Sequence, residues 1–183
     1  MNFLPPDVTH DSRERFFGSQ ATPVADYLIP IFDEWFAEDD PDIRVSLFWS
    51  LLTLMLGGNT DTDLVGNSLM SYLVVETDGT IQAVDTLRIC KEGLAESGLN
   101  VLTDGLDDLH RGLPLVHQLV HEGLPLSAPC NECVHKRTCG GGYIPHRYSN
   151  ARGFDNPSVW CADIIKLLDH ILARTRITTA PPA

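Results

Sequence analysis

Positively charged side chains are scarce in this sequence of 183 residues. It has 13 Lys and Arg against 25 Asp and Glu, which gives a formal net charge of −12. Proteins that bind nucleic acids place a basic surface against the phosphates. The charge therefore argues against a nucleic-acid partner. Most of the excess acid lies in residues 1–91, which carry five basic and fifteen acidic side chains, whereas residues 92–183 carry eight and ten.

Long apolar runs and a basic N-terminal segment are also lacking. The longest apolar run, residues 46–57, is shorter than the roughly 20 residues that cross a bilayer. The sequence begins MNFLPP, without the basic residues and the apolar stretch of a secretory signal. We therefore expect a soluble, cytoplasmic protein with no membrane partner.

The composition is that of a globular domain, with 43% apolar and 21% charged residues. The length allows one domain, or one domain and a small piece, because domains usually have about 100–200 residues. It is too short for a complete (β/α) barrel enzyme together with an accessory domain. No internal repeat is visible in the sequence.

The pattern of apolar residues predicts two helices near the N-terminus. The first begins after Thr22 with Pro23 and continues to about residue 36, and the second covers about residues 43–56 before two glycines. Both carry aromatic side chains, which could line a peptide groove or pack the two helices as a hairpin. We favour the packed hairpin for these aromatic residues: Phe32, Trp35, Phe36, Phe48 and Trp49.

A β-hairpin is predicted next, with strands in residues 72–76 and 80–84. The turn contains Asp78 and Gly79, a pair typical of hairpin turns. We expect short helices and turns in residues 92–112. The remaining segments are expected to form a helix, a loop and an amphipathic C-terminal helix, at residues 113–121, 123–142 and 157–174. Together these elements predict the α+β fold class.

Four of the five cysteines form a pattern that contains one close pair. Cys130 and Cys133 are followed by Cys139 and, much further along the chain, by Cys161. A disulfide framework is not expected in a reducing compartment, so metal ligands or buried side chains remain. Structural zinc is usually held by two close pairs, whereas three thiolates from one loop and a fourth from elsewhere suit an iron–sulfur cubane. The spacing favours the cluster, with zinc or free buried thiols as alternatives.

The residues around this loop also fit an anionic group. The backbone amides of Gly140, Gly141 and Gly142 could donate hydrogen bonds to sulfur. Residues 136–152 contain four basic side chains and no acidic one, which would offset the charge of thiolates. His146 could orient an anion or move a proton, or it could be a structural histidine. Cys90 has no cysteine near it in the sequence and is expected to be a core residue.

These motifs resemble the C-terminal SPASM region of radical S-adenosylmethionine enzymes that modify ribosomally made peptides, especially the FxsB-like branch that forms cyclophanes. The resemblance covers essentially the whole chain. It implies a SPASM-type domain with a β-hairpin, a cysteine-rich cluster loop and flanking helices, and a cluster environment that includes Tyr143, His146 and Arg147. It also implies that Cys130, Cys133, Cys139 and Cys161 hold one auxiliary 4Fe–4S cluster. The resemblance rests on residues 75–79, 84–87, 130–143, 146–148 and 153–163.

The sequence departs from that family in two respects. Tyr143 stands where complete SPASM domains have another cysteine, and upstream cysteines are missing, so a second auxiliary cluster is not expected. The Cys-x3-Cys-x2-Cys motif, which holds the S-adenosylmethionine cluster in the family, is absent from these 183 residues. The resemblance thus implies either a fragment of a longer enzyme or a stand-alone domain that works with a separate catalytic chain.

The resemblance also implies a division of the chain and a function. Residues 1–68 would be the end of the family's barrel and its bridging helices, and residues 69–183 the auxiliary-cluster domain. The chain would bind a precursor peptide within a radical S-adenosylmethionine oxidoreductase that crosslinks it, and would be inactive alone. The alternative from the cysteines is a non-catalytic, zinc-stabilised interaction module that binds a peptide or protein.

Overall fold

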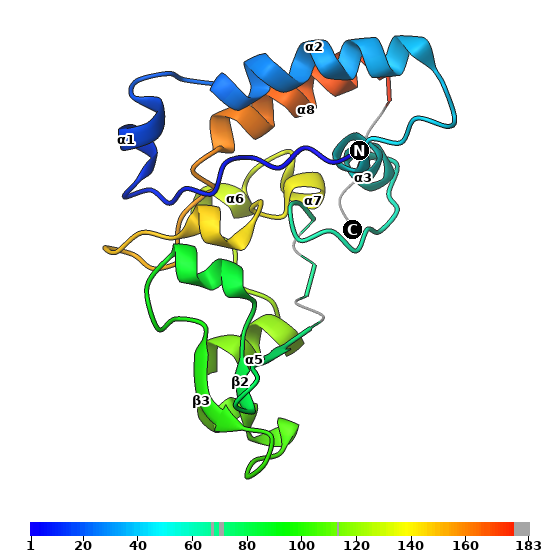
Figure 1. Ribbon diagram of the computed structural model, residues 1–183. Helices are drawn as coiled ribbons and strands as arrows, with labels where there is room; N and C mark the ends of the chain where they lie inside the picture. Colours follow the sequence, from blue (N-terminus) through cyan, green and yellow to red (C-terminus); the bar gives the residue numbers. More distant parts are fainter. Residues whose placement is uncertain (67, 70–71, 113, 178–183) are drawn as a thin grey trace. The chain divides into compact units, whose positions relative to one another are not determined.

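The computed structural model describes residues 1–66, 68–69, 72–112 and 114–177 (Figure 1). The chain divides into two compact units, one made of Met1–Ser68 with Leu126–Ala183 and the other of Leu69–Pro125. Helices and a small antiparallel sheet make up the structure, which confirms the α+β class. A unit boundary thus falls after residue 68, and residues 126–183 share a unit with residues 1–68. The identity assigned to residues 1–68 and 69–183 stays a prediction.

The first unit is helical. Figure 1 shows its two long helices, α2 and α8, side by side. The short α6 and α7 lie within residues 123–142, for which the sequence predicted a loop. The helical elements of this unit are α1 (Arg13–Phe17), α2 (Pro23–Glu38), α3 (Ser46–Met55), α6 (Ala128–Asn131), α7 (Lys136–Cys139), η3 (Ile144–Arg147) and α8 (Cys161–Thr175).

The N-terminus of α2 is capped by a side chain from another helix. Pro23 is the first residue of α2, as the sequence predicted, but the preceding Thr22 makes no side-chain capping bond. The amides of Val24 and Ala25 instead donate to Oδ1 of Asp163 on α8, at 2.8 and 2.9 Å. Because the first amides of a helix have no partner within it, this carboxylate joins the starts of α2 and α8.

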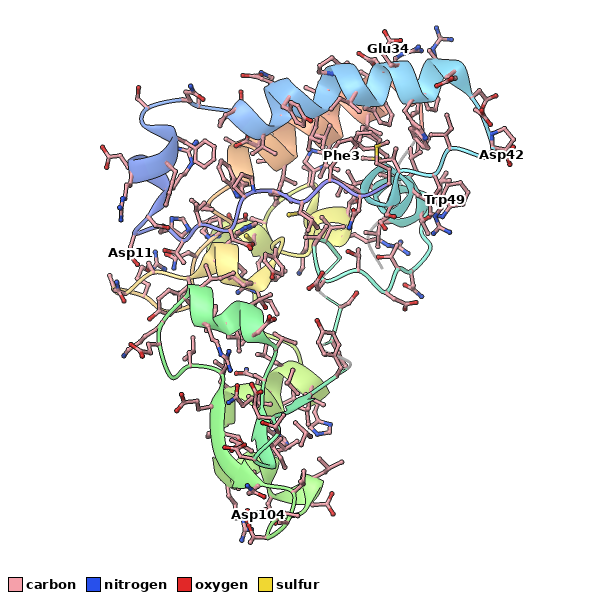
Figure 2. All side chains as sticks on the ribbon, viewed as in Figure 1. Phe3, Asp11, Glu34, Asp42, Trp49 and Asp104 are labelled. Carbon is pink, nitrogen blue, oxygen red and sulfur yellow. The ribbon has the colours of Figure 1, made fainter. Side chains whose placement is uncertain are left out.

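The aromatic residues of α2 and α3 form a packed core, which confirms the helical-hairpin interpretation. Phe32 and Phe48 are fully buried, and their rings meet edge to face with centroids 5.2 Å apart. Trp35 contacts Phe48 with a centroid distance of 5.6 Å. Trp49 on α3 is the exception, since it is 52% exposed (Figure 2). The aromatic stripe therefore serves mainly as packing.

Helix α8 closes the same core with its apolar face. Leu167, Leu168 and Ile171 are buried and belong to one cluster with Phe32 and Phe48. The predicted helix at residues 157–174 was wrong at its start, because α8 begins at Cys161. A turn at Ser158 precedes the helix: the Ser158 hydroxyl accepts the amide of Trp160 at 3.1 Å, and the Ser158 carbonyl accepts the amide of Cys161 at 2.9 Å.

The second unit holds an antiparallel sheet of strand order β1-β2-β3. The predicted hairpin is confirmed, and its turn depends on Gly79, whose φ is +85°. The amide of Thr80 donates to the side chain of Asp78 at 2.9 Å. The helix expected over residues 113–121 is confirmed for Pro114–His121; residue 113 lies outside the described residues. The elements are β1 (Val74–Val75), β2 (Thr80–Gln82), η1 (Asp85–Ile89), β3 (Glu96–Asn100), η2 (Leu106–Asp108), α4 (Leu109–Gly112) and α5 (Pro114–His121).

The sequence analysis missed strand β3. Residues 92–112 were expected to form short helices and turns, but Glu96–Asn100 pairs with β2 through an irregular register. Ser97 and Leu99 are buried on one face of β3, and the Ser97 hydroxyl donates to the carbonyl of Ile81. The strand has no β-branched or aromatic residue and contains Gly98 at a φ of +72°, so it lacks the composition that predicts strands.

In the part of the chain that the structure describes, no helix has both the length and the apolar character needed to cross a membrane.

Candidate metal centre

Cys130, Cys133, Cys139 and Cys161 line one cavity of about 150 Å³. We call it the cysteine cavity. Cys130 lies on α6, Cys139 is the last residue of α7, and Cys161 is the first residue of α8. Cys133 lies between α6 and α7, so the structure brings the four predicted ligands together from the loop at residues 130–139 and the start of α8.

Backbone hydrogen bonds hold Cys130 and Cys139 in their local turns. The amide of Cys130 donates to the carbonyl of Ser127 at 3.0 Å, and that of Cys139 donates to the carbonyl of His135 at 2.8 Å. All four side chains are partly buried free thiols. Within the described ranges, no three His, Cys, Asp or Glu side chains are close enough to hold a single ion.

Burial raises the pKa of two of these thiols, Cys139 and Cys161. The pKa of Cys139 is raised to about 12, mainly by burial and in smaller part by the neighbouring Cys161, Cys130 and Cys133, while a hydrogen bond from the Gly141 amide acts in the opposite direction. Burial also raises the pKa of Cys161, with Cys130 and Cys133 contributing. A buried thiol of high pKa is a poor nucleophile. A metal that displaces the thiol proton would make such cysteines useful as ligands.

The three glycines after Cys139 all have positive φ, at +59° for Gly140, +88° for Gly141 and +73° for Gly142. Their amides do not all face sulfur. The amide of Gly141 bonds to the Cys139 thiol, whereas those of Gly140 and Gly142 donate to the carbonyls of Lys136 and Cys139, each at 2.8 Å. Gly140 and Gly142 thus shape the turn, and Gly141 contacts the candidate ligand.

We expect Gly141→Ala to destabilise this turn more than Gly153→Ala. A Cβ on Gly141 would lie 2.8 Å from Cδ2 of Leu126, in addition to the strain of the positive φ. Strain of this kind costs about 1–3 kcal/mol. Gly153 also has a positive φ, but nothing lies within 4 Å of its Cβ position. Urea unfolding of both variants measures the difference, and equal losses of free energy would contradict a steric role for Leu126.

Arg147 brings a positive charge near the cysteine cavity. It is buried, and its guanidinium donates to the carbonyl of Phe154 at 3.1 Å. Burial lowers the pKa of Arg147, while Cys130, Asp155 and Cys139 act in the opposite direction. Lys136 lines the cysteine cavity itself. The basic residues noted in the sequence therefore include two that could offset thiolate charge here.

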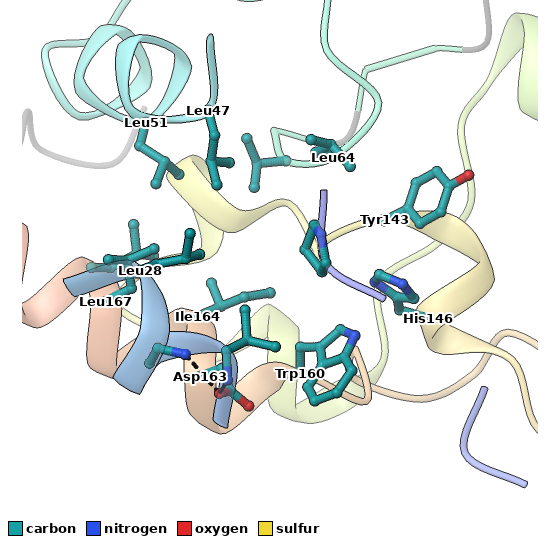
Figure 3. A pocket seen from close by; sticks show the side chains of 15 residues that line it. Leu28, Leu47, Leu51, Leu64, Tyr143, His146, Trp160, Asp163, Ile164 and Leu167 are labelled. Atoms are coloured by element: carbon teal, nitrogen blue, oxygen red, sulfur yellow. Dashed lines mark hydrogen bonds between the residues drawn. The ribbon is translucent and has the colours of Figure 1, made fainter. Parts of the chain in front are cut away.

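His146 and Tyr143 line a different cavity, of about 40 Å³ (Figure 3). We call it the apolar cavity. His146, Tyr143 and Trp160 lie at one end, and leucines of α2, α3 and α8 at the other. The His146 ring is buried, with Nε2 3.1 Å from the carbonyl of Pro6, and burial lowers its pKa to about 4. At neutral pH it is therefore an uncharged, hydrogen-bonded core residue.

His146 should make the protein less stable in acid. The unfolded chain binds a proton at His146 below a pH of about 6.5, whereas the folded chain resists protonation down to about 4. The free energy of unfolding is therefore unaffected by protonation of His146 above a pH of about 6.5. It decreases as the pH falls from about 6.5 to about 4, by up to about 3 kcal/mol. Urea unfolding at pH 7 and pH 4.5 should show a larger loss for wild type than for His146→Gln. An equal loss would contradict the assignment.

Two residues of the region were not singled out in the sequence. His135 lines the cysteine cavity and is buried, and its Nε2 lies 2.8 Å from Oδ1 of Asp169 on α8. The separation of 34 positions along the sequence hid this pair, although a histidine two positions after Cys133 could have drawn attention.

Cys90 belongs to the other unit, where burial raises its pKa to about 12, in keeping with a core residue.

The fold has counterparts among solved structures, although no family model and no curated protein matches the sequence. The chain resembles anSMEcpe with bound AdoMet at 18% identity and a TM-score of 0.68, covering 87% of this chain and 43% of that one. A second structure, anSMEcpe with bound AdoMet and Cp18Cys peptide, is 18% identical with a TM-score of 0.68, and the match covers 87% of this chain and 44% of that one.

The chain has the fold of part of anSMEcpe. That protein is an anaerobic sulfatase-maturating enzyme of the radical S-adenosylmethionine class and contains a SPASM domain. At 18% identity the likeness shows the fold alone. It does not single out the FxsB-like branch. The chain spans about two fifths of the solved structures that it matches.

Proposed function

We propose that this chain is the auxiliary-cluster and peptide-binding part of a radical S-adenosylmethionine peptide maturase. The observation that carries the proposal is the convergence of Cys130, Cys133, Cys139 and Cys161 on one cavity. The fold shared with part of anSMEcpe supports it, since one structure of that enzyme contains a peptide. The S-adenosylmethionine chemistry would belong to a catalytic core outside these residues, in the same protein or in a separate chain.

The cavity suits a 4Fe–4S cluster better than zinc. Zinc needs four sulfurs within about 2.3 Å of one point, whereas thiols around a cavity of about 150 Å³ leave room for a larger group. The four thiolates would hold the cluster, which when bound supplies a one-electron redox centre. The Gly141 amide donates toward the thiolate of Cys139. Lys136 and Arg147 would offset negative charge, because one lines the cavity and the other lies near Cys130 and Cys139.

The affiliation with the FxsB-like branch rests on the motif resemblance. On that basis the substrate is a ribosomally made precursor peptide, and the complete enzyme crosslinks two of its residues. The chain's part in that reaction would be to hold the peptide and to accept an electron after the crosslink forms. Without the core that cleaves S-adenosylmethionine, it would not carry out the reaction.

Anaerobic reconstitution with iron and sulfide tests the proposal. The reconstituted chain should be brown, absorb in the visible range and contain about four iron and four sulfide per chain. The matched measurement is zinc content after expression in zinc-supplemented medium. A colourless protein with one tightly held zinc per chain and no capacity for iron and sulfide would overturn the cluster and support the zinc-stabilised module.

A further inference from the structure

His135 and Asp169 connect the two segments that carry the cysteines. His135 lies in the loop between Cys133 and Cys139, and Asp169 lies on α8, two turns after Cys161. The Nε2–H group of His135 donates to Oδ1 of Asp169 at 2.8 Å, because an ionised carboxylate can only accept. The contact thus spans from the loop with three thiols to the helix with the fourth.

The positions of these residues place the contact against the cysteine cavity. His135 lines that cavity and is only 6% exposed, whereas Asp169 is 64% exposed. On α8, Cys161, Ile165 and Asp169 are spaced by four residues and share one face. Cys161 and Ile165 line the cavity, so Asp169 continues its wall toward solvent. A buried imidazole is thereby anchored by a carboxylate at the rim.

We propose that His135 and Asp169 form a clamp that holds the cysteine loop on α8 and keeps the four thiols ready to bind one group. Both are positioning residues, and neither is a ligand. The role of the clamp in loading a cluster rests on the proposed function. Residues that orient metal ligands typically contribute 10- to 100-fold to metal affinity, which sets the upper range expected for this clamp.

The chain contains a matched control for this pair. His170, also on α8, places Nε2 2.8 Å from Oδ1 of Asp33 on α2. This second pair joins α8 to α2, and neither His170 nor Asp33 lines the cysteine cavity. Asp33 also pairs with Arg174 at 3.5 Å, so Asp33→Ala removes at least as many contacts as Asp169→Ala. Any general weakening of α8 should therefore appear in both variants.

The test compares the full-length chain with Asp169→Ala, Asp169→Glu and Asp33→Ala. With limiting iron and excess sulfide, we expect Asp169→Ala to retain about tenfold less iron than wild type. Asp169→Glu, which keeps a carboxylate acceptor, should restore most of the loading, and Asp33→Ala should load as wild type does. The iron that Asp169→Ala retains should also show a shifted reduction potential, because a negative charge near the site has been removed.

A second measurement needs no cluster. In metal-free protein, iodoacetamide should alkylate Cys133, Cys139 and Cys161 several-fold faster in Asp169→Ala than in wild type or Asp33→Ala, as mass spectrometry of the peptides can show. If wild type takes up no iron, the proposed function fails, and these alkylation rates still decide whether the clamp exists. Equal alkylation and equal iron loading in Asp169→Ala and Asp33→Ala would overturn the clamp while leaving the proposed function intact.

Discussion

Cys161→Ser is expected to reduce the iron and sulfide retained after anaerobic reconstitution by about tenfold or more. Cys161 supplies the one thiol of the cysteine cavity that does not come from the loop at residues 130–139. Without it, three thiols remain for the four iron atoms of the cluster, and a serine hydroxyl binds iron poorly by comparison. Iron and sulfide analysis after gel filtration measures the loss.

Cys90→Ser is the control for that experiment. Cys90 is also a partly buried thiol of raised pKa, but it belongs to the other unit. The Cys90→Ser variant should therefore retain the wild-type content of iron and sulfide. Equal retention in Cys161→Ser and wild type would contradict the assignment of Cys161 as a ligand. Equal losses in both variants would show that iron loading reports general unfolding and would contradict the four-ligand account.

Trp160→Ala should lower the free energy of unfolding by about 3–5 kcal/mol, the usual range for a buried aromatic residue. The Trp160 side chain is fully buried and lies directly before Cys161. Its ring meets Phe17 with a centroid distance of 4.9 Å, and its Nε1 donates to the carbonyl of Pro6 at 3.3 Å. The substitution removes this packing and leaves the Pro6 carbonyl with one donor fewer. Urea unfolding monitored by circular dichroism measures the effect.

Trp49→Ala provides the comparison of the same chemical change at the surface. Trp49 is 52% exposed, and the guanidinium of Arg44 lies 5.2 Å from its ring centroid. An exposed cation–π contact contributes about 0.5–1 kcal/mol, so Trp49→Ala should cost far less than Trp160→Ala. A cost for Trp160→Ala no greater than that for Trp49→Ala would contradict the role of Trp160 in supporting the start of α8.

The sequence predicted the elements that have strong local patterns. The helices around Phe32, Phe48 and Leu168 were found because their apolar residues recur at helical spacing, and the hairpin was found through Asp78 and Gly79. Strand β3 was missed because what defines it is pairing with β2 and the burial of Ser97 and Leu99. Neither property is visible in local composition.

The candidate site was predicted as a set of residues and not as an arrangement. Cysteine spacing indicated which thiols converge, because three of them lie within ten positions of one another. The sequence could not show that, of the three consecutive glycines, Gly141 is the one whose amide donates to the Cys139 thiol, because nothing in the sequence distinguishes the three. Nor could it pair His135 with Asp169 or assign His146 to the apolar cavity, because those contacts join segments far apart in the chain.

The most direct test of the central claim is the position of iron in a crystal of the anaerobically reconstituted chain. Diffraction measured on both sides of the iron absorption edge locates iron by its anomalous signal. The account predicts iron density within the cysteine cavity, bonded to the sulfurs of Cys130, Cys133, Cys139 and Cys161. A cavity without iron, or one holding a single zinc ion bound by the same four sulfurs, would contradict it.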